Sequence, residues 1–490
     1  MNLKQFNELV AADYNRIPLL REMNADLDTP LSIYLKLASE SNTYLFESMQ
    51  GGEKWGRYSL IGLSTNNLLK LTGDQLQIIA DGHVQTDLKS SDPLGEIQKF
   101  KDSFRVPDLP NMPRFTGGLV GYFGYDSVRY VEKKLATSTP PDQMNIPDVM
   151  LLVSEELIIF DNLAGTITLV VHADPSVPDA FNHFNRRLDL LEIKLASTSA
   201  NPFDMTSGHQ KVSEDSFVSS FGEERYKEAV RKIKDYTIAG DIMQVVPSQR
   251  LSAPFFEEPI NLYRSLRRLN PSPYMFYINL EDFFIVGSSP EVLARLENEV
   301  VTVRPIAGTR RRGVDEAEDK ALERDLMEDP KELAEHLMLI DLGRNDVGRI
   351  SKSGSVEVTE KMIVERYSHV MHITSNVTGN VQENLTSIDI IKAVLPAGTL
   401  SGAPKIRAME IIDEVEPVKR NIYGGAVGYL GWNNNMDMAI AIRTAVVKDN
   451  VLHVQAGGGV VADSDPQMEW EETMNKARAI IRAAESLGEG

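Results

Sequence analysis

The chain has 490 residues, 42% of them hydrophobic and 25% charged, which is the balance of a globular protein with a large core. Its formal net charge of −20 argues against a nucleic-acid partner, because phosphate binding needs a basic face. It contains no cysteine, which excludes disulfides, thiolate metal sites and a glutaminase built on a cysteine nucleophile.

The N-terminal residues 1–15 predict an amphipathic helix and not a signal peptide. No apolar run approaches the roughly 18 residues of a membrane span. We therefore expect a cytoplasmic protein without a membrane partner.

Strand-like runs dominate the first 200 residues, at 42–48, 68–80, 117–124, 149–161 and 165–173. Residues 196–210 are rich in Ser, Thr, Asn, Pro and Gly and predict a linker. The sequence thus predicts an N-terminal part, 1–200, and a C-terminal part, 211–490.

The C-terminal part opens with a helical pattern at 217–239. Further strands are expected at 276–280, 283–288, 300–305, 424–432, 438–448 and 451–461, and helices at 330–341, 388–394, 405–413 and 466–487. Strands and helices do not alternate strictly, and no G-x-G-x-x-G follows an early strand. The pattern therefore favours an α+β class with extensive antiparallel sheet over a doubly wound fold.

Two pairs of glutamates stand at expected helix starts. Asp329 and Pro330 are a typical N-cap and first helical residue, and Glu332 and Glu335 follow on one face of the first turn. The same order recurs in Asp465, Pro466, Glu469 and Glu472. If the helices converge, four carboxylates surround one point and suit Mg²⁺. A single pair is more typical of a solvated helix face that favours the helix dipole.

Groups that suit an anion accompany the second pair. Gly457, Gly458 and Gly459 let backbone N–H groups approach a carboxylate, although a lone glycine run is more typical of a bulge or turn. Arg443 is a charge in the apolar run 438–447, where a buried arginine needs an anionic partner unless the strand edge faces water. Lys476 lies four residues after Glu472, which an ordinary ion pair explains just as well.

Seven motifs from residue 217 to the C-terminus resemble those of one family, the chorismate-utilising enzymes. They are Gln244-Val245-Val246, Ser289-Pro290-Glu291, Pro305-Ile306-Ala307-Gly308-Thr309, Asp341-Leu342-Gly343-Arg344-Asn345-Asp346, Thr399-Leu400-Ser401-Gly402-Ala403-Pro404-Lys405, Tyr423-Gly424-Gly425-Ala426-Val427-Gly428-Tyr429 and Ala462-Asp463-Ser464. The resemblance implies the fold of that family, a large antiparallel β-sandwich with helices on the outside.

Within the family the sequence most resembles component I, the large subunit, of the anthranilate synthases. Ala307 stands where aminodeoxychorismate synthases usually carry a lysine that attacks the ring, and Gln244 stands where isochorismate and salicylate synthases carry a lysine that activates water. The resemblance thus implies that ammonia adds to chorismate beside the carboxylate-bearing carbon, that the ring hydroxyl leaves, and that pyruvate is eliminated to give anthranilate for tryptophan biosynthesis. Aminodeoxychorismate synthase component I, of the folate pathway, is the alternative.

The resemblance also implies roles for the glutamates. Glu335 and Glu472 would hold Mg²⁺ directly, with Glu332 and Glu469 holding its waters. The ion would bind the ring carboxylate and polarise the carbon that ammonia attacks.

For the chemical steps, Glu291 would be the general acid that protonates the departing hydroxyl, and His372 would assist pyruvate loss and aromatisation. Gln244 and Thr309 complete the implied catalytic set. Substrate contacts would come from Thr399, Tyr423, Arg443, Gly457, Gly458, Gly459 and Lys476. Taken singly, Glu291 is also typical of a helix cap, and His372 of a hydrogen-bonded core histidine.

Two blocks resemble the tryptophan-binding segments of the family. The first is Leu45-Phe46-Glu47-Ser48, with phenylalanine in place of the second leucine, followed by Arg57-Tyr58-Ser59-Leu60-Ile61-Gly62. The second is Asn270-Pro271-Ser272-Pro273-Tyr274-Met275-Phe276. The resemblance implies that L-tryptophan binds Leu45, Glu47, Ser48 and residues 270–276 and inhibits by feedback, with most of this site in the N-terminal part. Some relatives bind tryptophan without being regulated by it, so a site with a purely structural role is the alternative.

Because the chain has no cysteine, the resemblance implies that a separate glutamine amidotransferase subunit supplies ammonia in a hetero-oligomer. A third interpretation is a catalytically inactive tryptophan-sensing subunit. It predicts a broken acid or metal position, but Glu291, Glu335, Glu472 and Arg443 are all intact.

Overall fold

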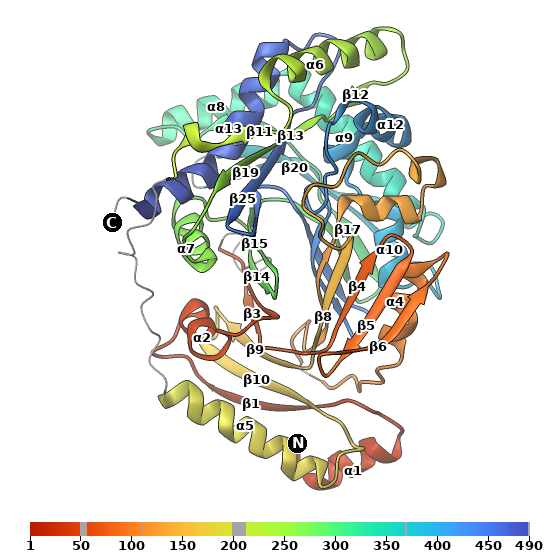
Figure 1. The fold of residues 1–490 in the computed structure, drawn as a ribbon, viewed down its shortest axis with the longest axis vertical. Coiled ribbons are helices and arrows are strands. Elements are labelled where there is room, and N and C mark those ends of the chain that lie inside the picture. Colours follow the sequence, from red (N-terminus) through yellow and green to blue (C-terminus); the bar gives the residue numbers. More distant parts are fainter. Residues whose placement is uncertain (50–55, 111, 198–211, 368–369, 489–490) are drawn as a thin grey trace.

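The computed structural model describes residues 1–49, 56–110, 112–197, 212–367 and 370–488. Two large sheets form the centre of the molecule and helices cover their outer faces (Figure 1). Every strand pair among the described residues is antiparallel.

The first sheet has 11 strands. In spatial order they are β1 (Ile17–Asn24), β10 (Thr166–Ala173), β9 (Glu156–Asp161), β3 (Tyr58–Gly62), β2 (Thr43–Glu47), β14 (Tyr274–Leu280), β15 (Phe283–Ser289), β24 (Thr444–Lys448), β25 (Val451–Gly457), β13 (Ser248–Pro254) and β11 (Val218–Ser219).

The second sheet has 12 strands. Their order is β18 (Ile306–Arg311), β20 (Val370–Asn380), β17 (Val300–Val303), β16 (Val292–Glu297), β23 (Met436–Ile440), β22 (Ala426–Gly431), β7 (Gly118–Phe123), β8 (Val149–Ser154), β4 (Leu68–Thr72), β5 (Gln75–Ala80) and β6 (His83–Lys89), with β19 (Glu357–Arg366) also paired to β20. A small separate sheet pairs β12 (Gln244–Val245) with β21 (Gly402–Ala403).

The alternation of side chains along the strands explains why the sheets stack. On β14, Phe276 and Ile278 enter a core shared with Val120 and Leu152 of the other sheet, whereas Tyr277 points to the opposite face, against the helices. The second sheet likewise turns its other face to a separate helix-covered core. The expected α+β class, an antiparallel sandwich with helices outside, is confirmed.

The helices were only partly predicted. They are α1 (Leu3–Ala11), α2 (Pro30–Leu37), α4 (Pro93–Asp102), α5 (Ala180–Ser197), α6 (Glu223–Ile238), α7 (Pro259–Leu269), α8 (Glu316–Glu328), α9 (Pro330–Gly348), α10 (Ser387–Val394), α11 (Gly398–Ser401), α12 (Lys405–Val415) and α13 (Pro466–Glu485), with short 3₁₀ turns at Tyr125–Tyr130, Lys133–Leu135, Glu214–Ser216 and Ser486–Gly488. None of the helices in the described part of the chain is long and apolar enough to cross a membrane.

Three expected strands are each two strands in the structure. The run 68–80 turns at Gly73, whose φ of +57° suits glycine, and so divides into β4 and β5. The run 149–161 divides into β8 and β9, and 438–448 into β23 and β24. The expected helix 217–239 also begins later, at Glu223, after the short strand β11.

Each sheet contains strands from both expected parts of the chain. In the first sheet β2 pairs with β14, and in the second β7 pairs with β22. Most of the expected linker, 198–210, lies outside the described residues, and residues 196–197 end α5. Both parts contribute strands to one sandwich. The division of the chain into two parts at this linker therefore stays a prediction.

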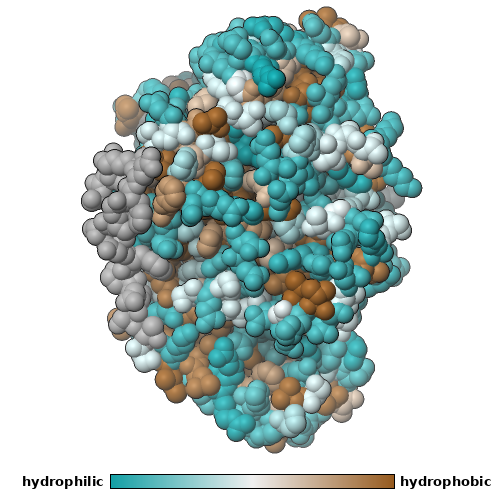
Figure 2. All heavy atoms as spheres, viewed as in Figure 1, coloured by the Kyte–Doolittle hydropathy of each residue, from teal (hydrophilic) through white to brown (hydrophobic). Residues whose placement is uncertain are grey.

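Figure 2 shows one face of the molecule, which is mostly hydrophilic with small, separate hydrophobic groups. This surface agrees with the large excess of acidic residues in the sequence.

Candidate active site

Both glutamate pairs begin helices, as predicted. Asp329 is the N-cap of α9, and its side chain accepts hydrogen bonds from the backbone N–H groups of Lys331 and Glu332. Asp465 caps α13 in the same way, through Gln467 and Met468. A proline occupies the first turn of each helix, where its missing N–H costs nothing.

The two pairs lie close enough to influence each other. Burial raises the pKa of Glu335, and the charges of Glu332 and Glu472 raise it further. Burial also raises the pKa of Glu469, and Glu472 adds to that effect. The effect of Glu472 on Glu335 shows that the first turns of α9 and α13 lie near each other, so negative charge from the two helices is brought together.

The carboxylate oxygens of the four glutamates suit a divalent cation, although they do not form a complete set of ligands around one point. Oε2 of Glu469 is buried and has no hydrogen-bond partner among the described residues. Glu472 pairs with Lys476 at 2.7 Å and Glu332 with Arg310 at 3.2 Å. Among the described residues, no three acidic or histidine side chains are placed to hold one ion together. Two direct carboxylate ligands completed by waters remain compatible with this geometry.

The glycine run connects this acidic region to the end of β25. A Cβ on Gly458 would come within 2.9 Å of Oε2 of Glu469, so any larger residue would displace that carboxylate from its present position. Lys476 donates to the carbonyl of Gly457 at 2.9 Å, and the hydroxyl of Tyr423 lies beside the same glycine. The N–H of Gly458 already donates to the carbonyl of Pro247 at 3.3 Å.

Gln244 joins the same cluster from β12. It is buried, and its hydrogen bond to Glu335 lowers the pKa of that glutamate. Its Nε2 lies 2.2 Å from the position that a Cβ on Gly459 would take, so a larger residue at 459 would move the Gln244 amide.

Arg443 is not inside a strand, and that prediction was wrong. Its φ is +47°, and it lies in a bend between β23 and β24. Neither of the expected alternatives, a buried strand position or a water-facing edge, applies. Burial lowers the pKa of Arg443, whereas Glu291 and Tyr367 raise it. The side chain makes no hydrogen bond or ion pair with the part of the chain that the structure describes, so its guanidinium suits an external anion.

Glu291 lies between β15 and β16 and does not cap a helix. It is 7% exposed. Burial raises its pKa to a net value of about 8, which already includes the lowering effects of the hydrogen bond from Thr399 and of the charges of Arg443 and Lys476. The Thr399 hydroxyl donates to Oε1 at 3.1 Å. Glu291 is therefore a protonated acid at neutral pH.

His372 on β20 faces β18 across a β-bulge. Gly308 adopts φ +65° at this bulge, and Thr309 pairs with His372. Nδ1 of His372 lies 3.0 Å from the Gly308 carbonyl and 3.0 Å from Oγ1 of Thr309. A carbonyl only accepts, so Nδ1 carries the proton and Nε2 keeps its lone pair. Burial lowers the pKa of His372 to about 4, which keeps the ring neutral.

Tyr367 belongs to this region but was missed from the sequence. Its ring packs edge-on against His372, with centroids 5.5 Å apart, and its hydroxyl donates to Glu365 at 3.0 Å. The only signal was its place in the same short segment as His372, since a lone tyrosine carries no recognisable chemistry.

The tryptophan-related blocks meet at a separate cavity of about 260 Å³. Pairing of β2 with β14 brings Phe46 opposite Phe276. Of the ten residues predicted from sequence, six line this cavity: Glu47, Ser48, Pro273, Tyr274, Met275 and Phe276. Leu45 is in the helix-covered core. Asn270, Pro271 and Ser272 do not line the cavity, and Ser288 donates to both the Asn270 carbonyl and Ser272.

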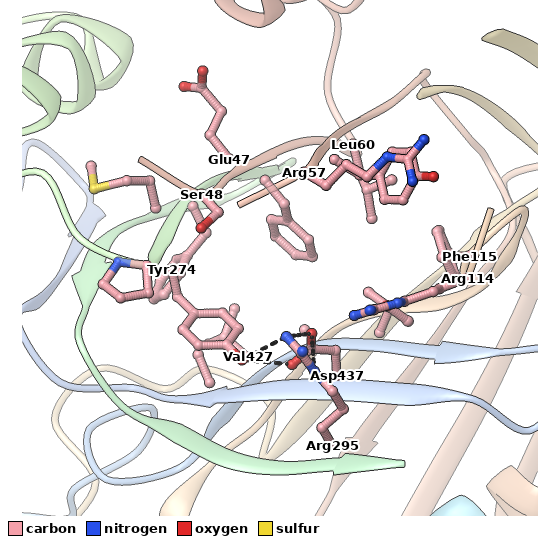
Figure 3. Close-up of a pocket in the computed structure, with 18 of the residues that line it drawn as sticks. Glu47, Ser48, Arg57, Leu60, Arg114, Phe115, Tyr274, Arg295, Val427 and Asp437 are labelled. Carbon is pink, nitrogen blue, oxygen red and sulfur yellow. Dashed lines mark hydrogen bonds and ion pairs between the residues drawn. The ribbon is translucent and has the colours of Figure 1, made fainter. Parts of the chain in front are cut away.

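Glu47 does not direct its carboxylate into the cavity. It accepts hydrogen bonds from Tyr263 at 2.6 Å and Arg267 at 2.9 Å, and Figure 3 shows it pointing away. The polar groups at the cavity include Asp437, which accepts from Tyr274 at 2.9 Å and pairs with Arg295 at 2.6 Å. Sequence reasoning missed Asp437 and Arg295 because they reach the cavity from distant strands.

Comparison with known proteins identifies the family. The family model described as chorismate binding enzyme matches residues 42–482. Anthranilate synthase component 1 of Pseudomonas aeruginosa is 60% identical over 485 residues, covering 99% of this chain and 98% of that relative. The crystal structure of anthranilate synthase component I from Streptococcus pneumoniae has a TM-score of 0.77 and 35% identity, covering 94% of this chain and 99% of that one.

The fold extends to more distant enzymes. The menaquinone-specific isochorismate synthase of Escherichia coli has a TM-score of 0.70 at 18% identity, covering 99% of this chain and 98% of that one, and thus shares the fold. The family model, the sequence relatives and the solved structure agree: this chain belongs to the chorismate-binding enzymes, in the anthranilate synthase component 1 family.

Proposed function

We propose that this chain converts chorismate and ammonia into anthranilate, pyruvate and water. The observation that carries the proposal is that two buried groups, the acid Glu291 and the neutral His372, both lie close enough to the guanidinium of Arg443 for its charge to lower their pKa values. An acid, a base and an anion receptor in one buried region suit loss of a hydroxyl and then loss of a proton from a dianionic ring.

In the first step the nitrogen of ammonia bonds to the ring, the ring double bonds shift, and the bond from the ring to its hydroxyl breaks; the new ammonium group then releases one proton to become an amine. Glu291 gives its proton to that hydroxyl, which leaves as water. Because Thr399 donates to Oε1, the acidic proton resides on Oε2 and is directed away from the threonine. The charges of Arg443 and Lys476 then stabilise the carboxylate that remains.

In the second step a ring C–H proton is removed while the enolpyruvyl oxygen leaves. Nε2 of His372 is the base, since Nδ1 is committed to the Gly308 carbonyl. The C–H electron pair completes the aromatic ring, and the released enolpyruvate takes up a proton to become pyruvate. Thr309 and the ring of Tyr367 hold the imidazole in this orientation.

Substrate carboxylates would bind at two places. We assign the enolpyruvyl carboxylate to Arg443, Tyr423 and the Gly459 amide, and the ring carboxylate to the region of Lys476 and the four glutamates. The N–H of Gly458 already donates to the Pro247 carbonyl, so it is less available to the substrate.

Glu335 and Glu472 would hold Mg²⁺, with Glu332 and Glu469 binding its waters. The orphaned oxygen of Glu469 and the raised pKa values of Glu335 and Glu469 support a cation in this region. When bound, the ion offsets the ring carboxylate and polarises the ring toward nucleophilic attack.

Tryptophan is proposed to inhibit the enzyme from the cavity that β2 and β14 of the first sheet line together with β22 and β23 of the second. Its size suits an amino acid, its wall includes Phe46, Phe115 and Met275, and Ser48, Arg114 and Asp437 offer polar contacts. Inhibition requires that tryptophan favour one of two states of the enzyme.

A separate glutamine amidotransferase is proposed to supply ammonia in a hetero-oligomer. The name component 1, carried by the relatives, supports a second component. The absence of cysteine in this chain supports a glutaminase located elsewhere.

The test is to incubate the purified chain with chorismate, Mg²⁺ and an ammonium salt and to follow anthranilate fluorescence. We expect turnover with ammonium and none with glutamine. Accumulation of non-fluorescent aminodeoxychorismate, which needs a separate lyase to give 4-aminobenzoate, would favour the alternative enzyme instead.

The metal assignment has its own test. We expect Glu335→Gln to abolish turnover while leaving the circular dichroism spectrum intact. Glu471→Gln is the matched control, because Glu471 is an exposed α13 residue that bonds only to Gln467 among the described side chains. Full activity of Glu335→Gln at limiting Mg²⁺ would refute the assignment.

A further inference from the structure

Arg310 on β18 connects three acidic residues of two helices. Its guanidinium donates to Asp325 at 2.6 Å, to Asp329 at 2.8 Å and to Glu332 at 3.2 Å. The side chain is 21% exposed, and the hydrogen bonds that it donates to these carboxylates raise its pKa. A planar, permanently charged group with several donors is suited to hold three carboxylates in fixed directions.

Two of the three contacts fix the helix that carries the first glutamate pair. Asp329 is the N-cap of α9, and its other oxygen accepts from Lys331 and Glu332 at 3.0 and 3.4 Å. Arg310 thus holds the cap from outside while it contacts Glu332 directly. Glu335 follows one turn later on the same face, so its direction depends on the same first turn.

The backbone of β18 leaves room for Glu332 beside Arg310. Gly308 lies two residues before Arg310, and a Cβ there would come within 3.2 Å of Oε2 of Glu332. One carboxylate oxygen therefore lies over the backbone of Gly308 and the other faces Arg310.

The second glutamate pair is held differently. Asp465 caps α13 but forms no ion pair with the described residues, and the cation that holds Glu472 is Lys476 of the same helix. Within the part of the chain that the structure describes, only the first pair contacts a cation that comes from a neighbouring strand.

We propose that Arg310 is a positioning residue that orients Glu332 and Glu335 toward the divalent cation. This inference rests on the proposed function of the glutamates. Partners of metal-binding carboxylates affect metal affinity without touching the ion, and their loss weakens binding by about 10–100-fold. Arg310 additionally joins α8 to α9 through Asp325, which keeps the first turn of α9 in register with β18.

The experiment measures Mg²⁺ binding to the purified chain without substrate, by titration calorimetry and by the Mg²⁺-induced rise in Tm. We expect Arg310→Gln to weaken binding at least about tenfold and to lose most of the rise in Tm. Arg311→Gln is the matched control: Arg311 is the next residue of β18, is 61% exposed and pairs with Glu318 away from the glutamate pair. Its Mg²⁺ affinity is expected to stay within about twofold of the wild type.

Arg310→Lys serves as the second variant, because it keeps the charge but cannot bond to three carboxylates at once. We expect intermediate affinity, about threefold or more below the wild type, and this measurement decides the question if Arg310→Gln fails to fold. Wild-type affinity in either folded variant overturns the inference. Tighter binding also overturns it, since Arg310 would then merely compete with the ion.

Glu335→Gln separates this inference from the proposed function. If that variant binds Mg²⁺ as tightly as the wild type, the metal assignment itself is wrong. If it loses Mg²⁺ while Arg310→Gln and Arg310→Lys bind normally, only the role of Arg310 is wrong.

Discussion

The hydroxyl of Thr399 donates a hydrogen bond to Oε1 of Glu291 at 3.1 Å, joining α11 to the loop between β15 and β16. The bond stabilises the ionised carboxylate and so partly offsets the effect of burial, which leaves the pKa at about 8. The two residues therefore set the pH at which the proposed acid loses its proton.

Replacement of Thr399 is expected to move the alkaline limb of the pH profile. Thr399→Val removes the hydrogen bond, so the pKa of Glu291 rises and turnover persists to higher pH. Thr399→Ser keeps a hydroxyl and should retain the wild-type limb near pH 8. The rate is measured at a fixed concentration of free ammonia, because ammonium also titrates. An unchanged limb in Thr399→Val would show that another group controls it.

Glu291→Gln is expected to reduce turnover by about 10²–10⁴-fold, the usual contribution of general acid catalysis. It should also stabilise the fold. The unfolded chain ionises this glutamate near its ordinary pKa, whereas the folded chain keeps it protonated to about pH 8. Between these values, folding of the wild type costs roughly 1.4 kcal/mol more per pH unit.

Glutamine has no such cost, so the gain in Tm of Glu291→Gln should be absent at pH 4 and grow toward pH 8. Thermal denaturation across this range provides the measurement. A gain that does not depend on pH would mean that Glu291 is not kept protonated by the fold.

His372→Asn is expected to uncouple the two chemical steps. An asparagine amide can still donate to the Gly308 carbonyl, but it offers no base at the position of Nε2. Chorismate should therefore be consumed while an aminated product that retains its enolpyruvyl group accumulates. Chromatography of the reaction mixture detects that product. Equal loss of chorismate consumption and anthranilate formation would remove His372 from the second step.

Asp437→Asn is expected to weaken inhibition by tryptophan and to spare catalysis. Asp437 accepts from Tyr274 and pairs with Arg295 at the cavity, and the loss of its charge loosens both cavity residues. The tryptophan concentration for half-inhibition should rise about tenfold, the loss of about 1.4 kcal/mol of binding, with the uninhibited rate nearly unchanged. Normal inhibition in this variant would locate the regulatory site elsewhere.

The parts of the site that sequence predicted well depend on local chemistry. Asp329 and Asp465 were identified as N-caps because a cap is formed by residues within one helical turn. The prediction that Arg443 lies inside a strand was wrong because its conformation depends on distant strands. The apolar run around it fits one strand, and the bend with φ +47° arises because β23 and β24 belong to different sheets.

By itself, the sequence determined which groups are available: two capped glutamate pairs, a glycine run, an acid, a histidine and no cysteine. These follow from residue type and short spacing. The tertiary structure alone decided which groups meet and in what protonation state. The pKa of Glu291 depends on burial and on cations from distant segments, and Arg310 reaches α9 from a separate strand. The physical reason is that desolvation and long-range pairing depend on the packed sandwich, which no local stretch of sequence contains.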